Sequence, residues 1–180
     1  MSKGKILVQL SGSISAYKAC YVISRLVQSD FEVQTAATAN ALRFVGAATL
    51  EGLSGKPVFS DAYETGRMLD HIHLAKWADL AILCPASANS ISRLASGLAD
   101  NALGSLFLSF DPSKKPYLIA PAMNQAMFSH PATQAALSRL ESWKVQILPT
   151  DEGPQACGDV GLGRLLDPDR IFEEIAGRFR

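Results

Sequence analysis

Several residues with chemically useful side chains follow an apolar run in the second half of this sequence. The run, residues 117–120, has the composition of a buried parallel strand, and Pro121 directly after it opposes a helix at the strand end. The amide of Asn124 then lies between two thioethers, Met123 and Met127. Ligands of open α/β sheets bind at the carboxyl ends of the strands, so this stretch predicts a ligand site. A polar turn flanked by two core methionines is the structural alternative.

Two imidazoles, His71 and His73, lie just before the most apolar run of the chain. Imidazole titrates near neutral pH, so either side chain could act as an acid or a base. In an extended segment the two rings would share a face and could bind a metal, whereas in a helix they would not. Since no third ligand of suitable type lies at a helpful spacing, the sequence indicates no metal site. The structural alternative to an acid–base role is a hydrogen-bonded histidine on the surface.

Small polar residues follow the other apolar runs as well. The turn 11–15 joins a run to a helical pattern, where free backbone N–H groups and Gly12 would suit an anion. It is neither GxGxxG nor a P-loop, so simple helix capping is the alternative. Thr38 and Asn40 are N-cap candidates after the next run, and residues 85–90 combine a proline stop with hydroxyl and amide groups.

The segment 150–164 contains four glycines and one proline. This composition predicts a loop without regular structure, and a loop of this length in a compact domain is usually functional or disordered. Cys157 lies in it near Asp159 and Arg164, and is therefore a candidate reactive thiol. Cys84, inside an apolar run, is expected to be a small core residue.

Strand-like and helix-like patterns alternate along the chain. They predict a doubly wound α/β fold, in which helices cover both faces of one parallel sheet and residues 1–180 form a single domain. The polar turns described above would then meet at the carboxyl edge of the sheet. We expect strands at 5–10, 31–37, 80–84, 117–120 and 145–148, and helices at 16–28, from 38–41 to 49–55, and at 91–98, 102–110, 131–143 and 170–179.

The composition excludes several classes of protein. Seventeen basic residues balance seventeen acidic ones, so no overall field favours nucleic acid or an acidic membrane surface. No apolar run approaches the roughly 20 residues that span a bilayer, and the start of the chain predicts no signal peptide. Three unclustered cysteines suit the reducing cytoplasm rather than a disulfide framework or a zinc site.

Five motifs, taken together and in order, resemble the homo-oligomeric flavin-containing cysteine decarboxylases, and the resemblance covers nearly the whole chain. Ser90 and Phe128 depart from the residues usual in the family, but they keep a hydroxyl and an aromatic ring. The motifs are Ser-Gly-Ser-Ile at 11–14, His-Ile-His-Leu at 71–74, Pro-Ala-Ser-Ala-Asn-Ser at 85–90, Pro-Ala-Met-Asn-Gln-Ala-Met-Phe at 121–128 and Ala-Cys-Gly-Asp-Val-Gly at 156–161.

The resemblance implies a bound FMN and assigns roles by matching positions. It implies that the phosphate and ribityl chain are held by Gly12, Ser13, Ile14, Thr38 and Asn40, and the ring by Ser87, Ala88, Asn89, Ser90 and Ala122. It also implies catalytic roles for His71 and Cys157, and substrate contacts from Asn124, Met127, Ala156 and Gly158.

Within the family, the motif around Cys157 favours the branch that acts in coenzyme A biosynthesis. The implied reaction decarboxylates 4′-phosphopantothenoylcysteine to 4′-phosphopantetheine through a thioaldehyde and an enethiol, and Cys157 would supply the proton for the final reduction. The resemblance further implies a homotrimer with flavin near the subunit interface. In many bacteria the corresponding region is joined to a phosphopantothenate–cysteine ligase.

Other functions remain open at this point. A peptidyl-cysteine decarboxylase would share the flavin, His71 and Asn124 but stop at the enethiol, so it would need no proton donor like Cys157. A non-catalytic flavin-binding regulator belongs to a different class, although the fungal examples carry acidic extensions that this chain lacks. Flavin prenyltransferases share the fold without the histidine and PxMN motifs, and an FMN electron carrier would leave His71, Asn124 and Cys157 unexplained.

Overall fold

A parallel sheet of five strands forms the centre of the computed structural model, which describes residues 2–61, 63–156 and 158–179. The strand order is β2-β1-β3-β4-β5, the order of a flavodoxin-like doubly wound sheet. This confirms the predicted fold class. The strands are β1 Lys5–Leu10, β2 Glu32–Ala37, β3 Leu80–Ala86, β4 Tyr117–Pro121 and β5 Gln146–Ile147.

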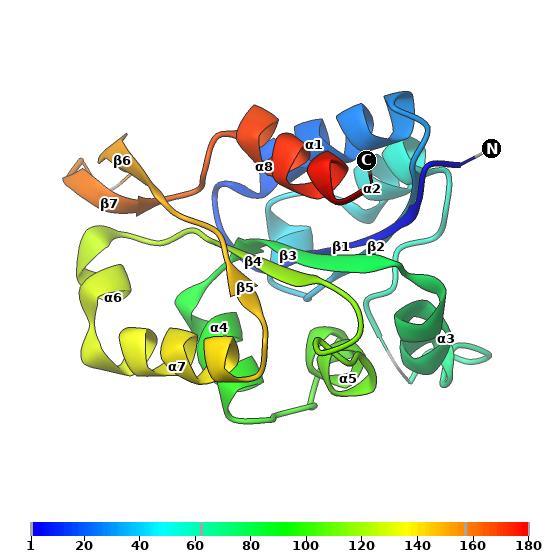
Figure 1. Ribbon diagram of the computed structural model, residues 1–180. Coiled ribbons are helices and arrows are strands. Elements are labelled where there is room, and N and C mark those ends of the chain that lie inside the picture. Colours follow the sequence, from blue (N-terminus) through cyan, green and yellow to red (C-terminus); the bar gives the residue numbers. More distant parts are fainter. Residues whose placement is uncertain (1, 62, 157, 180) are drawn as a thin grey trace.

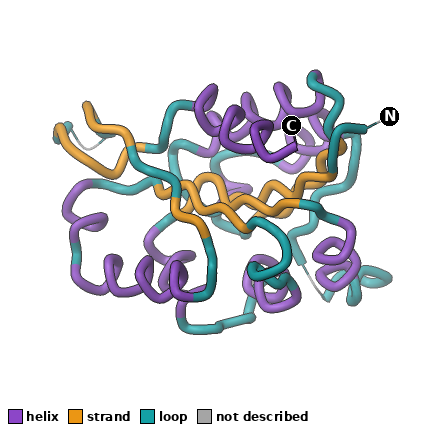
Figure 2. Tube along the Cα trace, viewed as in Figure 1, coloured by secondary structure: helices purple, strands orange, loops and turns teal. Residues whose placement is uncertain are grey.

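Helices cover both faces of this sheet (Figures 1 and 2). One face carries α1 Ala16–Gln28, α2 Ala47–Ser54 and α8 Pro168–Ala176, and the other carries α3 Asp70–Trp77, α4 Ala88–Ala95, α5 Ala102–Ser109 and α7 Pro131–Ser142. The short helix α6 Gln125–Ser129 lies at the carboxyl end of β4, and the 3₁₀ turns are η1 Ala41–Arg43 and η2 Gly177–Phe179.

Alternation along the strands divides the core into two layers. Ile6, Val8 and Leu10 of β1 pack with the layer of α1 and α8, while Leu7 packs with the opposite layer. Because β1 is buried on both faces, it reads as a nearly continuous apolar run, which made it recognisable in the sequence.

A polar pair crosses this apolar sheet. The Tyr117 hydroxyl on β4 donates a hydrogen bond of 3.0 Å to Oε1 of Gln9 on β1, and both side chains are fully buried. Burial raises the pKa of the Tyr117 phenol, while the bond to Gln9 acts in the opposite direction. The pair therefore remains neutral inside the sheet.

The structure corrects the predicted loop at 150–164. This segment contains an antiparallel hairpin, β6 Asp151–Pro154 and β7 Val160–Arg164, in which Gly153 lies opposite Gly161. The glycines that argued against regular structure instead adopt backbone angles that the irregular register requires: φ is +144° at Gly153 and +105° at Gly163.

Several other bounds differ from the expectation; among them, the helix expected from 38–41 to 49–55 is divided into η1 and α2. The strand β3 continues through Pro85 to Ala86, because a proline at the end of a strand loses only a donor and its carbonyl can still accept. The helix α4 begins at Ala88 rather than residue 91, since Ser87 caps it. The polar excursion at 56–67 also contains a buried residue, Phe59, which bridges Ala36 of β2.

None of the helices in the described part of the chain is both long and apolar enough to cross a bilayer.

Candidate functional site at the carboxyl edge of the sheet

Hydrogen bonds from one buried hydroxyl join two of the predicted turns. Ser11, directly after β1, donates from Oγ to the Pro85 carbonyl at 2.8 Å and accepts from the backbone N–H of Ser87 at 2.8 Å. The Ser87 hydroxyl in turn accepts from the backbone N–H of Ser90 and so caps α4. Ser11 is fully buried, and it fixes the turn after β1 against the turn after β3.

The turn after β2 lies against the turn after β1. A Cβ atom at Gly12 would lie 2.9 Å from Cβ of Asn40, so only glycine permits this close approach. Thr38 Oγ1 accepts the backbone N–H of Ala41 at 3.0 Å, whereas Asn40, the other N-cap candidate, makes no such bond. The ends of three strands, β1, β2 and β3, thus bring the predicted residues Gly12, Thr38, Asn40 and Ser87 to one edge, as parallel topology requires.

A cavity of about 410 Å³ opens at this edge. The start of α1, the segment after β4 and the β6–β7 hairpin surround it. It brings together five of the predicted site residues, and it adds charged and aromatic groups that were not singled out. The lining residues are Ser13, Ile14, Ser15, Tyr17, Lys18, Ala122, Met123, Asn124, Pro154, Gln155, Ala156, Gly163, Arg164 and Leu165.

Asn124 is the N-cap of α6. Its Oδ1 accepts the backbone N–H of Met127 at 2.9 Å, which fixes the orientation of the amide. Since the oxygen is used by the helix, the amide nitrogen provides the groups available to a ligand in the cavity, and these are donors only. An anion, and a carboxylate in particular, fits such a group.

The hairpin is bound to the chain on both sides of Asn124. The N–H of Met123 donates to the Gly163 carbonyl at 2.9 Å, and the N–H of Gln125 donates to Oε1 of Gln155 at 3.1 Å. A Cβ at Gly163 would lie 2.6 Å from the Met123 carbonyl oxygen, so the close contact also requires glycine there. Gln155 completes the arrangement by donating from Nε2 to the Leu162 carbonyl at 2.8 Å.

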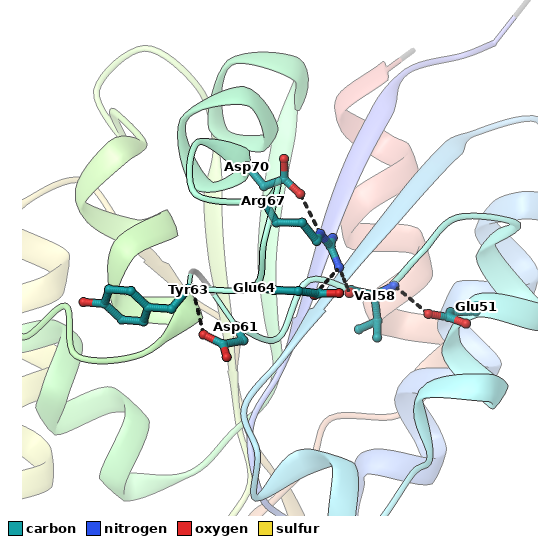
Figure 3. A network of polar contacts seen from close by, with 7 residues as sticks. All are labelled: Glu51, Val58, Asp61, Tyr63, Glu64, Arg67 and Asp70. Carbon is teal, nitrogen blue, oxygen red and sulfur yellow. Dashed lines mark hydrogen bonds and ion pairs between the residues drawn. The ribbon is translucent and has the colours of Figure 1, made fainter.

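A separate network holds the start of α3, where His71 lies (Figure 3). Arg67 donates from Nε to Asp70 at 2.8 Å and from Nη1 to the Val58 carbonyl at 2.7 Å. Glu51 accepts the N–H of Val58 at 3.2 Å. Arg67 therefore fixes the first residue of α3 to the segment that pairs with β2.

The single chain does not bring His71 into the cavity beside Asn124. Figure 1 shows α3 and α6 near opposite ends of the molecule, and no residue of α3 lines the cavity. His71 and His73 lie on a helix, the alternative in which two residues that are two positions apart do not share a face. Nδ1 of His71 is buried and has no hydrogen-bond partner among the described residues, so this ring has an unused polar atom.

The remaining predicted residues divide as follows. Met127 is 47% exposed on α6 and, like Gly158, is absent from the cavity lining. Ala88, Asn89 and Ser90 form the first turn of α4 rather than a loop, beside the Ser11 network. Cys157 lies outside the described residues. The described residues contain no group of three or more metal-ligating side chains.

The sequence did not single out Lys18 or Gln155, and it marked Ser11 only as part of the turn 11–15, not as the residue that joins two turns. Each acts through tertiary contacts: Ser11 reaches a turn 76 residues away, and Gln155 reaches α6 across 30 residues. Lys18 looked like an ordinary polar position of α1, since helical periodicity only marks the buried face. No local signal in the sequence could have revealed that Lys18 and Gln155 line one cavity, or that Ser11 joins the two turns after β1 and β3.

Several known proteins are similar to this chain. The family model described as Flavoprotein matches residues 1–180. A probable phosphopantothenoylcysteine decarboxylase of Streptococcus mutans is 40% identical over 173 residues, which cover 95% of this chain and 96% of that protein. The coenzyme A biosynthesis bifunctional protein CoaBC of Bacillus subtilis is 39% identical over 175 residues, 96% of this chain but 42% of the relative. The chain thus spans about two fifths of the bifunctional relatives it matches.

Solved structures share this fold. A cysteine-to-serine mutant of PPC decarboxylase, complexed with pantothenoylaminoethenethiol, superposes with a TM-score of 0.87 at 28% identity, covering 98% of both chains. The FMN-dependent cysteine decarboxylase SpaF superposes with a TM-score of 0.80 at 27% identity, covering 98% of this chain and 97% of the other.

Proposed function

Because this chain belongs to the flavoprotein family, we propose that it is an FMN-dependent carboxy-lyase acting on 4′-phosphopantothenoylcysteine. Its product would be 4′-phosphopantetheine, an intermediate of coenzyme A biosynthesis in the cytoplasm. The observation that carries the proposal is the cavity at the carboxyl edge, which Asn124 lines together with residues of the β6–β7 hairpin. The names of the Streptococcus mutans relative and of the PPC decarboxylase structure support the substrate.

The residues at the carboxyl edge fit FMN. The helix α1 begins with no side-chain cap and no acidic residue in its first turn, so its N–H groups can bind a phosphate at Ser13 and Ile14. Hydroxyl and amide groups of Thr38, Asn40 and Ser87 extend along the same edge. When bound, FMN supplies the redox chemistry of the reaction, oxidising the cysteinyl side chain and later returning the hydride.

Asn124 would bind the carboxylate that is lost. Its amide nitrogen donates hydrogen bonds without placing a full positive charge beside the carboxylate. A cation would stabilise the charged ground state more than the transition state, in which the negative charge leaves the carboxylate, and so would slow the reaction. The cap to Met127 keeps the donor face in place through the whole cycle.

His71 and Cys157 would move the protons. Loss of CO₂ from the thioaldehyde leaves an enethiolate, which takes up a proton to give the enethiol. Reduction to the saturated thiol then needs a hydride and a second proton, and Cys157 is the proposed donor of that proton. His71 would act as an acid, a base or an orienting group, a role that its buried and unpartnered Nδ1 supports.

A homotrimer would complete this site. His71 and Asn124 lie near opposite ends of one chain, so a site that contains both needs α3 of one subunit and α6 of another. A head-to-tail interface of this kind closes into a ring, and a ring of three agrees with the family resemblance. A phosphopantothenate–cysteine ligase is a proposed further partner, because the bifunctional relatives are longer proteins of coenzyme A biosynthesis.

Mass spectrometry of the products tests the proposed function. Purified protein should be yellow and should convert 4′-phosphopantothenoylcysteine into CO₂ and 4′-phosphopantetheine. The Cys157→Ser variant should still release CO₂ but accumulate the oxidised enethiol product. Wild-type protein that decarboxylates only a peptide with a C-terminal cysteine would instead be a peptidyl-cysteine decarboxylase, and one that binds FMN but decarboxylates neither would be a regulator. Normal product from Cys157→Ser at the wild-type rate would remove Cys157 from the mechanism.

A further inference from the structure

The cavity beside Asn124 has a charge that differs from that of the whole protein. The chain is neutral overall, with seventeen basic and seventeen acidic residues. Among the residues that line the cavity, however, Lys18 and Arg164 are the charged ones and both are cations; no aspartate or glutamate is among them. In a partly enclosed site such a surplus attracts an anion more strongly than an open surface would.

Arg164 lines the cavity and pairs with no carboxylate among the described residues. Its guanidinium lies across the face of Gly153 on the neighbouring strand, in space that any side chain at that position would occupy. The acid opposite it in the register, Asp151, pairs with Arg170 at 3.7 Å instead. No ion pair joins Arg164 to another residue in the part of the chain that the structure describes.

Lys18 faces the same cavity from the opposite wall. It lies in the first turn of α1, where the helix dipole disfavours a cation and where no acidic residue compensates. Like Arg164, it is half-buried and makes no ion pair with a described residue. Two half-buried cations without counter-charges, on two walls of one cavity, indicate that the ligand supplies the negative charge.

We propose that Lys18 and Arg164 bind the phosphate of the substrate and so select a phosphorylated pantothenoyl compound over an unphosphorylated one. The inference rests on the proposed function. It divides the two anionic ends of the substrate between two kinds of group: the neutral Asn124 amide takes the carboxylate that must leave, and the cations take the phosphate that stays. Cations bind a dianionic phosphate strongly. Because the charge of the phosphate does not change during the reaction, they stabilise the ground state and the transition state equally and do not slow the reaction.

Binding of the product measures this selection independently of turnover. Calorimetric titration of the FMN-loaded wild-type protein should show 4′-phosphopantetheine binding at least about tenfold more tightly than pantetheine, as expected for charge-assisted hydrogen bonds. Lys18→Met and Arg164→Met should each weaken the phosphorylated ligand about tenfold and leave pantetheine within about twofold. Methionine keeps an apolar stem of similar length, so packing is largely preserved.

The matched control is Lys114→Met, which removes one positive charge from an exposed side chain before β4, at the amino edge of the sheet. It should leave both affinities unchanged. FMN also carries a phosphate, so the flavin absorbance retained after gel filtration is measured for every variant. Variants that lose FMN and keep the preference for 4′-phosphopantetheine would assign the cations to the cofactor and overturn the inference. So would a wild-type protein that binds both products equally. Failure of the proposed function itself would appear separately, as absence of CO₂ release.

Discussion

At the scale of single residues, the amide of Asn124 caps a helix and, in the proposed function, also binds the ligand. Its oxygen caps α6 through the Met127 N–H, and the residue lines the cavity, where its nitrogen is the proposed donor. An aspartate can cap a helix equally well, since a carboxylate oxygen accepts the same bond. The two roles can therefore be separated by a change of one atom.

We expect Asn124→Asp to fold normally and to lose catalysis. The new carboxylate keeps the cap, so the free energy of unfolding should stay within about 1 kcal/mol of the wild-type value. The donors for the substrate carboxylate are lost and a like charge takes their place, so kcat/KM should fall at least about a hundredfold. Steady-state kinetics and thermal unfolding measure the two effects.

The control exchanges the same two groups in the other direction. Asp167 caps α8 through the N–H of Asp169 and does not line the cavity. Asp167→Asn should retain both stability and activity. Full activity of Asn124→Asp would show that the amide nitrogen does not bind the substrate.

The Cys84 thiol is a second residue with a measurable signature. Burial raises its pKa to about 12, so the folded protein keeps it protonated where an unfolded chain, with a thiol pKa of about 8.5, releases the proton. The stabilisation from this group is complete below pH about 8.5 and is lost as the pH rises toward 12. We expect iodoacetamide at pH 8 to modify Cys84 only in urea-unfolded protein. Equal labelling rates with and without urea would contradict its burial.

At the scale of elements, the position of α3 depends on Arg67 (Figure 3). This side chain is 22% exposed and binds both Asp70 and the Val58 carbonyl. We expect Arg67→Met to lower the free energy of unfolding by about 1–2 kcal/mol, because it leaves a partly buried carboxylate and a carbonyl without their donor. It should also lower kcat, since α3 carries His71, and should leave FMN binding unchanged.

Arg178→Met is the comparison for this effect. Arg178 of η2 pairs with Glu174 of α8 at 3.6 Å, and a pair of this kind, four residues apart with a largely exposed carboxylate, contributes little. Its loss should cost under about 1 kcal/mol and leave kcat unchanged. Urea titration and kinetics of the two variants are compared. An Arg67→Met protein with wild-type kcat would mean that the network does not position His71.

Elements with local signals were predictable, and those held by distant contacts were not. The apolar run at 5–10 predicted a strand and the periodicity at 16–28 predicted a helix. The structure contains β1 and α1 with these same bounds. Convergence of Ser13, Ala122 and Asn124 followed from parallel topology alone. The hairpin was not predicted because its glycines are compatible with both a loop and a hairpin. Hydrogen bonds between the hairpin and residues 123–125 stabilise the hairpin, and these contacts are not visible in the local sequence.

At the scale of the whole molecule, the proposed homotrimer would make activity a property of the assembly, because His71 and Asn124 lie near opposite ends of one chain. A mixture of His71→Asn and Asn124→Asp chains, unfolded together and refolded with FMN, should regain activity that neither variant has alone. If each site takes His71 from one subunit and Asn124 from its neighbour, random assembly gives about one quarter of the sites both native residues.

Separately refolded variants, mixed afterwards, provide the control, and gel filtration verifies that the oligomers are equal in size. Recovery near one quarter of wild-type activity per subunit supports a shared site. A mixture no more active than its components would place both residues of each site within one chain.

The β6–β7 hairpin has a further consequence, for how this fold can change its chemistry. Its two strands pair with each other rather than with the central sheet, and it contacts the segment after β4 mainly through backbone groups and Gln155. Sequence changes within it therefore leave the sheet intact. We therefore expect that replacing the hairpin by the equivalent segment of a cysteine decarboxylase would change which thiol substrate is accepted and leave the interior of the fold unchanged.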